Sequence, residues 1–267
     1  MIGQGAFGKV YEAVTQTDGS AVAVKFLKRE FWQNSKSRSM FLREVDQASK
    51  VSHPNVVRYL GWGSSPHGGP FIIQQFIDGQ PLSQLRGSSP EQFREWLEET
   101  CDALNAIHQQ GIIHGDLTPN NILIDRSNQA YLSDFGFSQS YRVGPHASVP
   151  PRHSDDESPT DRPAIAAGTF GFLAPEQLLS SFGVIGPATD FFALGAIAYW
   201  YAFGRSIYAG SSQTDFWQSM LDESTIAMPS NENDWLHPFI QNCLIKSVSQ
   251  RPQSIEELRD LIAIPRD

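Results

Sequence analysis

The sequence has few cysteines, a deficit of positive charge and no long apolar run. Its two cysteines, Cys101 and Cys243, are too few for a disulfide framework or a thiolate metal cage, so we expect a reducing, cytoplasmic location. The 20 Lys and Arg against 29 Asp and Glu leave a net charge of −9. Because binding to a phosphate backbone needs surplus cations, we expect no nucleic-acid partner.

Membrane-spanning and leader patterns are not visible either. Met1 and Ile2 lead directly into glycines, without the basic and then apolar stretch of a signal peptide. The longest charge-free apolar run, Phe191 to Gly204, has about 14 residues, whereas roughly 18 are needed to cross a bilayer. This run predicts a buried helix, and we expect no membrane segment in this chain.

With 40% hydrophobic residues over 267 positions, the chain can bury a sizeable core in one large domain or two packed lobes. In the first eighty residues, turn signals separate runs rich in Val, Ile, Tyr and Phe. These predict antiparallel strands at Lys9–Val14, Ala21–Leu27, Val56–Trp62 and Phe71–Phe76. Apolar residues at helical spacing predict one helix among them, Ser39–Lys50.

After Asp78-Gly79 the pattern becomes mainly helical. Ser89 and Pro90 form a helix start, and apolar residues then recur on one face until Gly111. We expect short strands at Ile122–Ile124 and Ala130–Ser133, and helices at Pro175–Ser180, Ala188–Phe203, Thr214–Leu221, Asp234–Cys243 and Ile255–Ile262. The sequence thus predicts an α+β architecture, with a small antiparallel β lobe containing one helix joined to a larger, mainly helical lobe.

Two features of the first lobe are typical of phosphate binding. In Gly3-Gln4-Gly5-Ala6-Phe7-Gly8, glycines let backbone amides approach phosphate oxygens before a strand begins. Lys25 interrupts an apolar strand, where a buried ammonium needs an anion. Glu44 is the first candidate for that anion, and Glu30 or Glu12 could also pair with Lys25. Either feature alone is weak, because glycine-rich hairpins and exposed strand lysines are common.

Two segments of the second lobe carry the more specific signal. His114-Gly115-Asp116 is followed by Asn121, and Asp134 then opens Asp134-Phe135-Gly136. An acid and an amide at this spacing, with a second acid after a strand, supply one proton acceptor and two oxygen ligands for hard cations. A solvated acidic loop explains either segment by itself, but not both in this order.

In order and spacing, these segments resemble the eukaryotic-type (Hanks-type) protein kinase catalytic domain across nearly the whole chain. Further matches are His53-Pro54-Asn55, Ala174-Pro175-Glu176, Asp190 to Gly195, and Arg251-Pro252. The resemblance implies a single bilobal kinase domain over residues 1–267. Its N-lobe would be 1–77 with a truncated first strand, its C-lobe 78–267, and residues 141–163, with five Pro, a flexible activation-loop insertion.

The resemblance implies ATP and Mg²⁺ as cofactors and proteins as substrates. The nucleotide-binding residues would be Gly3, Gly5 and Gly8 over the phosphates, Lys25 at the α- and β-phosphates, Val10, Ala23 and Leu123 around adenine, and Gln74, Gln75, Phe76 and Ile77 in the lobe connection. Gln74 would occupy the gatekeeper position, where a polar residue is unusual.

The same resemblance implies the catalytic set. Asp116 would accept the proton of a Ser or Thr hydroxyl, Asn121 and Asp134 would bind magnesium, and Glu44 would hold Lys25. Glu176 and Arg251 would form a buried ion pair that ties the peptide-docking segment to the C-lobe.

Besides the insertion at residues 141–163, three departures from the family pattern change the expectations. Gly115 replaces the Arg that receives an activation-loop phosphate, so we expect activity without loop phosphorylation. Thr118 replaces a Lys that contacts the γ-phosphate, whereas Gly168-Thr169 resembles the Ser/Thr type. Met1 lies two residues before the first glycine, from which we expect a missing N-terminal stretch.

Two other functions fit parts of the pattern. Small-molecule phosphotransferases resembling aminoglycoside and choline kinases also use His-Gly-Asp, but need no Ala-Pro-Glu platform. A pseudokinase would bind ATP or a partner without transferring phosphate, although every acid, amide and Lys of the catalytic set is present.

Overall fold

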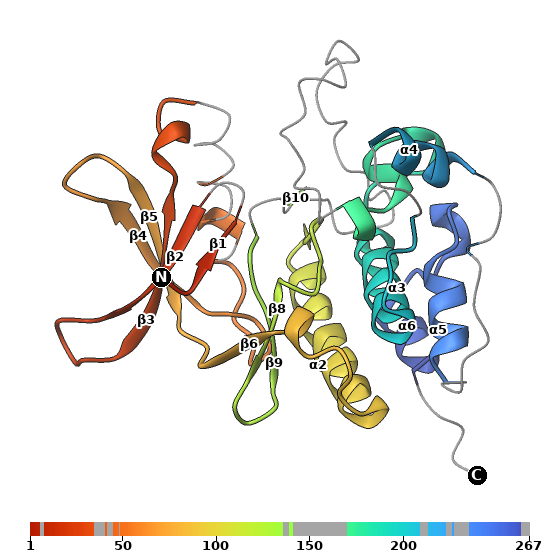
Figure 1. Ribbon diagram of the computed structural model, residues 1–267, viewed down its shortest axis with the longest axis horizontal. Coiled ribbons are helices and arrows are strands. Elements are labelled where there is room, and N and C mark those ends of the chain that lie inside the picture. The colour runs from red at the N-terminus through yellow and green to blue at the C-terminus, as the bar shows by residue number, and fades with distance from the viewer. Residues whose placement is uncertain are drawn as a thin grey trace.

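The computed structural model describes residues 1–5, 8–34, 41, 45–47, 49–135, 139–140, 170–208, 213–222, 226 and 235–262. Its N-terminal part is a five-stranded antiparallel sheet with strand order β1-β2-β3-β5-β4 (Figure 1). The strands are β1 (Gly3–Gln4), β2 (Gly8–Val14), β3 (Ala21–Leu27), β4 (Tyr59–Ser64) and β5 (Pro70–Gln75).

A small apolar core lies against this sheet. Leu27 of β3, Ile72 of β5 and Phe41 are buried together, and Trp32 packs against them. Residue 41 and residues 45–47 are helical, as predicted for this stretch; the remaining positions between 35 and 48, Glu44 among them, lie outside the described residues. Short 3₁₀ turn η1 (Arg29–Phe31) leads from β3 toward this region.

A second, three-stranded sheet begins the C-terminal part. It has the order β6-β8-β9, with β6 (Gly79–Pro81), β8 (Ile122–Asp125) and β9 (Ala130–Leu132), and 3₁₀ turn η2 (Leu82–Gln84) follows β6. Asn55, which precedes β4, joins this sheet to the first part: its Nδ2 donates to Ala130 O at 2.9 Å, and its carbonyl accepts from Leu132 N at 2.8 Å.

Helix α2 (Pro90–Gln109) packs beside β9 and begins as the sequence predicts. Ser89 Oγ accepts from Gln92 N at 3.3 Å and Ser89 N donates to Gln92 Oε1 at 3.3 Å, which forms a capping box with Pro at the first helical position. Strand β7 (Ile112–Ile113) follows and pairs with β10 (Gln139–Ser140).

The other described helices are α3 (Pro187–Phe203), α4 (Gln213–Leu221), α5 (Leu236–Cys243) and α6 (Ile255–Asp260), with short turns η4 (Phe170–Phe172), η5 (Pro175–Gln177), η6 (Ser180–Phe182) and η7 (Val248–Gln250). In Figure 1, they lie on the opposite side of the molecule from the five-stranded sheet. Helix α3 is almost entirely buried and packs on α5, which explains its continuous apolar sequence. Gly204, in the left-handed region with φ of +69°, ends α3.

The predicted fold class is confirmed, with an antiparallel sheet in the N-terminal part and helices in the C-terminal part. The predicted helix Pro175–Ser180 is wrong, because this stretch forms the two 3₁₀ turns η5 and η6. Strand β4 is shifted relative to Val56–Trp62, since Val56 makes an isolated parallel bridge to Leu132. The loop 141–163 lies outside the described residues, and the lobe boundary at 77/78 stays a prediction.

Both cysteines, Cys101 and Cys243, are buried free thiols. Within the part of the chain that the structure describes, no helix is both long and apolar enough to span a membrane.

Candidate active site

Lys25 and Asp134 meet although 109 residues separate them. Lys25 Nζ lies 2.8 Å from Asp134 Oδ1, and the Lys25 side chain is 13% exposed whereas that of Asp134 is 42% exposed. The largely buried Lys25 side chain therefore has an anion, as its place in an apolar strand requires. Among the described residues this anion is Asp134; Glu44 lies outside them, so its predicted pairing with Lys25 stays a prediction.

Strand pairing places several predicted nucleotide-binding residues side by side. Val10 of β2 lies opposite Lys25 of β3, and Ala23 of β3 lies opposite Gln74 of β5. Ala23 and Lys25 are two residues apart and so share one face of the sheet. Leu123, half-buried, belongs instead to β8 and pairs with Pro81.

The predicted lobe connection follows β5. Gln75 N donates to Arg58 O at 2.8 Å, and Gln75 Oε1 accepts from Arg58 N at 3.3 Å. Phe76 and Ile77 are half-buried between β5 and β6. These bonds attach the start of the connection to the segment that precedes β4.

The glycine segment forms the hairpin between β1 and β2. Gly3 lies opposite Val10, and Gly5 N donates to Gly8 O at 3.0 Å. A Cβ at Gly8 would lie 3.0 Å from Phe26 O, so glycine permits the close approach of β2 to β3 there. Gly5 is exposed, and none of the described residues comes within 4 Å of a Cβ placed on it, so these residues leave its backbone accessible to a ligand.

Asp116 and Asn121 belong to one turn that the neighbouring backbone supports. Asn121 Nδ2 donates to Asp116 O at 2.6 Å, and Asn121 O accepts from Ser133 N at 2.8 Å, directly before Asp134. Asp134 itself has φ of +66°, a left-handed conformation that Asp tolerates better than most residues. The turn that carries Asp116 and the residue before Asp134 are thereby held together.

The pKa of Asp116 is raised to about 8, first by burial of its carboxyl group and second by the negative charge of Asp134. The positive charge of Lys25 and a hydrogen bond from Asn121 oppose this increase. Added positive charge near Asp134 would therefore favour the ionised form of Asp116.

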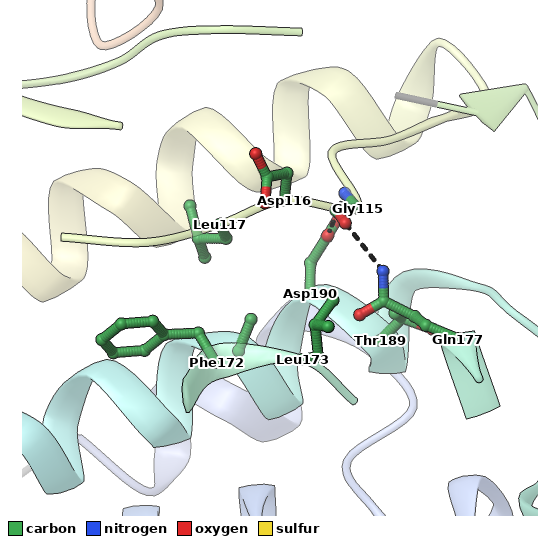
Figure 2. A pocket seen from close by; sticks show the side chains of 9 residues that line it. Gly115, Asp116, Leu117, Phe172, Leu173, Gln177, Thr189 and Asp190 are labelled. Atoms are coloured by element: carbon green, nitrogen blue, oxygen red, sulfur yellow. Dashed lines mark hydrogen bonds between the residues drawn. The ribbon is translucent and has the colours of Figure 1, made fainter. Parts of the chain in front are cut away.

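Asp190, at the start of α3, is a functional residue that the sequence reasoning quoted but gave no role. Its side chain is 1% exposed, and its carboxylate accepts from His108 Nε2 at 2.7 Å, His114 N at 2.9 Å and Gly115 N at 2.9 Å. Figure 2 shows Asp190 reaching from α3 toward Gly115, on the side away from the Asp116 carboxylate. The sequence held a signal for this role, because an Asp lies in the otherwise apolar run that forms α3. A carboxylate buried there needs several hydrogen-bond donors, which other segments must supply.

Glu176 and Arg251 form the predicted buried pair. Arg251 Nη1 lies 2.7 Å from Glu176 Oε1, Arg251 Nη2 lies 2.8 Å from Oε2, and both side chains are 0% exposed. This bidentate contact attaches η5 to the region after α5.

The donor set near Asp134 suits a hard divalent cation. Asp134 offers carboxylate oxygens and Asn121 an amide oxygen, and both ligand types are those that Mg²⁺ accepts. Since Mg²⁺ takes about six oxygen ligands, phosphate and water oxygens would complete its shell.

Comparison with known proteins agrees with this geometry. The chain is 27% identical over 274 residues to serine/threonine-protein kinase PknA of Mycobacterium tuberculosis, covering 100% of this chain and 60% of PknA. It is 30% identical over 280 residues to the DNA damage-responsive serine/threonine-protein kinase RqkA of Deinococcus radiodurans, of which it covers 39%. It is 29% identical over 273 residues to serine/threonine-protein kinase pkn2 of Myxococcus xanthus, of which it covers 31%.

The chain thus spans 60% or less of the length of these three relatives. The sequence model of the protein kinase domain matches residues 1–261, which includes every candidate site residue named above. The chain therefore belongs to the protein kinase domain family.

Proposed function

We propose that this chain is a catalytic domain that transfers the γ-phosphoryl group of ATP to Ser or Thr hydroxyl groups of proteins. The observation that carries the proposal is the 2.8 Å ion pair between Lys25 and Asp134, whose charges both act on Asp116. Membership of the kinase family supports the reaction type, and the names of the relatives support Ser and Thr as acceptors.

In the proposed reaction, the acceptor hydroxyl oxygen forms a bond to the γ-phosphorus while the bond from that phosphorus to the bridging oxygen of ADP breaks. Asp116 orients the hydroxyl and accepts its proton, and Lys25 holds the α- and β-phosphates. Mg²⁺ held by Asn121 and Asp134 would supply positive charge to the phosphate oxygens. Positioning and electrostatics, without covalent catalysis, are thus the main contributions of the protein.

The catalytic segment reads His114-Gly115-Asp116, and we propose that it works without an activation-loop phosphate. Gly115 has no side chain to receive a phosphate, and its N–H is already bound to Asp190. The buried donors around Asp190 support a catalytic segment that is ordered by the fold itself.

A small-molecule phosphotransferase is less well supported than a protein kinase. The fully buried contact of Arg251 with Glu176 fastens η5 and the segment before it to the helical part, and a platform of this kind serves to dock a peptide. A pseudokinase is disfavoured because Lys25, Asp116, Asn121 and Asp134 are all present.

The test is to incubate the protein with γ-labelled ATP, Mg²⁺ and a generic basic protein, beside a panel of amino alcohols. We expect label on Ser and Thr of the protein and none on the amino alcohols. Asp116→Asn should lower transfer about 100-fold or more, because a positioned base contributes about that factor. Asp134→Ala should also abolish measurable transfer.

The matched control is Asp260→Asn, which removes the same charge at an exposed position of α6 and should leave transfer unchanged. If wild-type transfer is measurable and neither Asp116→Asn nor Asp134→Ala lowers it, the assigned roles are wrong. Transfer to an amino alcohol alone would replace the protein-kinase proposal by the small-molecule one.

A further inference from the structure

The peptide bond that precedes Asp116 is held at both of its polar atoms by side chains. The carbonyl oxygen of Gly115 accepts from Gln177 Nε2 at 2.7 Å (Figure 2). The N–H of Asp116 donates to His114 Nδ1 at 3.3 Å. Because Ser133 O lies 3.0 Å from His114 Nε2 and can only accept, Nε2 carries the imidazole proton and Nδ1 is free of one. The plane of this peptide is therefore set by two side chains, His114 within the segment and Gln177 from outside it.

The glycine at position 115 makes this hold by side chains necessary. Its φ is +73°, and a glycine residue does not restrict rotation of the peptide that follows it as a residue with a Cβ does. Rotation of that peptide would turn the Cα–Cβ bond of Asp116 and displace its carboxylate. Since a displacement of about 1 Å can lower a reaction rate about 100-fold, the orientation of this peptide matters for catalysis.

Gln177 is itself anchored at both ends. Its Oε1 accepts from Ala174 N at 3.0 Å, which directs the NH₂ group of the amide to Gly115. The residue before it, Glu176, is fixed by the bidentate contact with buried Arg251. The side chain of Gln177 thus connects a rigid turn, η5, to the carbonyl that precedes the proposed base.

Asp190 also reaches this segment, but it binds backbone atoms other than the Gly115 carbonyl. Asp190 accepts from the N–H groups of His114 and Gly115, so it holds the entry to the segment. Figure 2 shows the Gln177 amide approaching Gly115 from η5, while the Asp116 carboxylate extends in the other direction. The bond from Gln177 therefore acts on a different atom from those that Asp190 binds.

We propose that Gln177 is a positioning residue for phosphoryl transfer. Its amide orients the peptide between Gly115 and Asp116 so that the Asp116 carboxylate meets the acceptor hydroxyl, and it connects that peptide to Ala174 of the segment proposed to dock the protein substrate. The inference rests on the proposed protein-kinase function and adds one residue outside the catalytic set.

The test compares two variants with a matched control. Gln177→Glu keeps the acceptor for Ala174 N but replaces the donor by a carboxylate oxygen that faces the Gly115 carbonyl. Gln177→Met keeps the length of the side chain and removes both hydrogen bonds. Gln241→Glu makes the same charge change at an exposed position of α5. For each protein, kcat, the KM for ATP, the KM for the protein substrate, nucleotide affinity and the thermal unfolding midpoint are measured.

We expect both Gln177 variants to lower kcat about 10- to 100-fold, with nucleotide affinity within about twofold of wild type. Amide hydrogen exchange at Asp116 should become faster in both, and Gln241→Glu should match wild type in every measurement. A general loss of structure would lower kcat and nucleotide affinity together, whereas the proposal expects only kcat to fall.

The proposal is overturned if both Gln177 variants keep kcat within about twofold of Gln241→Glu. It is also overturned if nucleotide binding and the unfolding midpoint fall together with kcat, because Gln177 would then be only structural. A wild-type protein that transfers no phosphate would instead refute the proposed function. Unchanged amide hydrogen exchange at Asp116 in both variants would separately refute the proposal that Gln177 orients the peptide between Gly115 and Asp116.

Discussion

Replacing Arg251 by Met should strongly destabilise the fold, because the guanidinium group uses all of its donors in a buried place. Arg has five N–H groups. In this structure they reach Glu176 Oε1 at 2.7 Å, Glu176 Oε2 at 2.8 Å, and the carbonyl oxygens of Ala188 at 3.1 Å, Ile245 at 2.5 Å and Lys246 at 2.8 Å. The guanidinium also lies over the Phe192 ring, 4.6 Å from its centroid.

The magnitude follows from what Arg251→Met leaves behind. The Glu176 side chain is 0% exposed, and removing one partner of a buried ion pair costs about 3–5 kcal/mol. Three backbone carbonyls lose a donor at the same time. Because a folded domain has a total stability of about 5–15 kcal/mol, this single change should remove about a fifth or more of it.

The assay is equilibrium unfolding in urea, with Arg126→Met as the matched control. Arg126 pairs with Asp78 at 3.0 Å, but their side chains are 81% and 60% exposed, so the loss should be about 0–1 kcal/mol. Adding Glu176→Leu to Arg251→Met should recover part of the stability, because the uncompensated charge is then gone. If Arg251→Met lies within about 1 kcal/mol of Arg126→Met, the reasoning about this buried pair is refuted.

Three further predictions concern other parts of the chain. Gly195→Ala should lower the free energy of unfolding by about 1–3 kcal/mol, because the added Cβ overlaps the Cβ of Cys243 where α3 packs on α5; Gly61→Ala, with open space at its Cα, is the control in the same urea titration. Thr118→Lys should leave phosphate transfer unchanged or raise it in a labelled-ATP assay, and abolished transfer would reveal a role for Thr118 not considered above. Changing Ser148, Ser154, Ser158 and Thr160 together to Ala should leave kcat nearly unchanged, whereas a loss of about 100-fold or more would contradict activity without loop phosphorylation.

Local sequence patterns were sufficient to predict a helix or strand where neighbouring residues alone cause it to begin or end. Ser89, Pro90 and Gln92 begin α2 through a capping box, and Gly204 ends α3 in a left-handed conformation. Likewise, an apolar run between turn signals predicted β3 with its observed bounds, Ala21–Leu27. These signals depend on residues within a few positions of each other, so the sequence alone carries them.

The stretch from Pro175 shows where local reasoning failed. Its sequence predicts a helix, but its side chains reach distant partners: Glu176 contacts Arg251, and Gln177 contacts Gly115. The chain forms the 3₁₀ turns η5 and η6 in place of a continuous helix. The free energy of a buried ion pair and a hydrogen bond outweighs the small difference in free energy between an α-helix and a 3₁₀ turn over a few residues.

The sequence by itself determined the family, the fold class and the set of residues that carry the proposed chemistry, because residue types and their order along the chain express these directly. Only the tertiary structure decided which groups meet. Lys25 pairs with Asp134, the buried carboxylate of Asp190 is surrounded by donors from two other segments, and Gln177 reaches the carbonyl before Asp116. Each of these contacts joins residues more than 60 positions apart, and such pairs depend on how the whole chain packs, which no local spacing records.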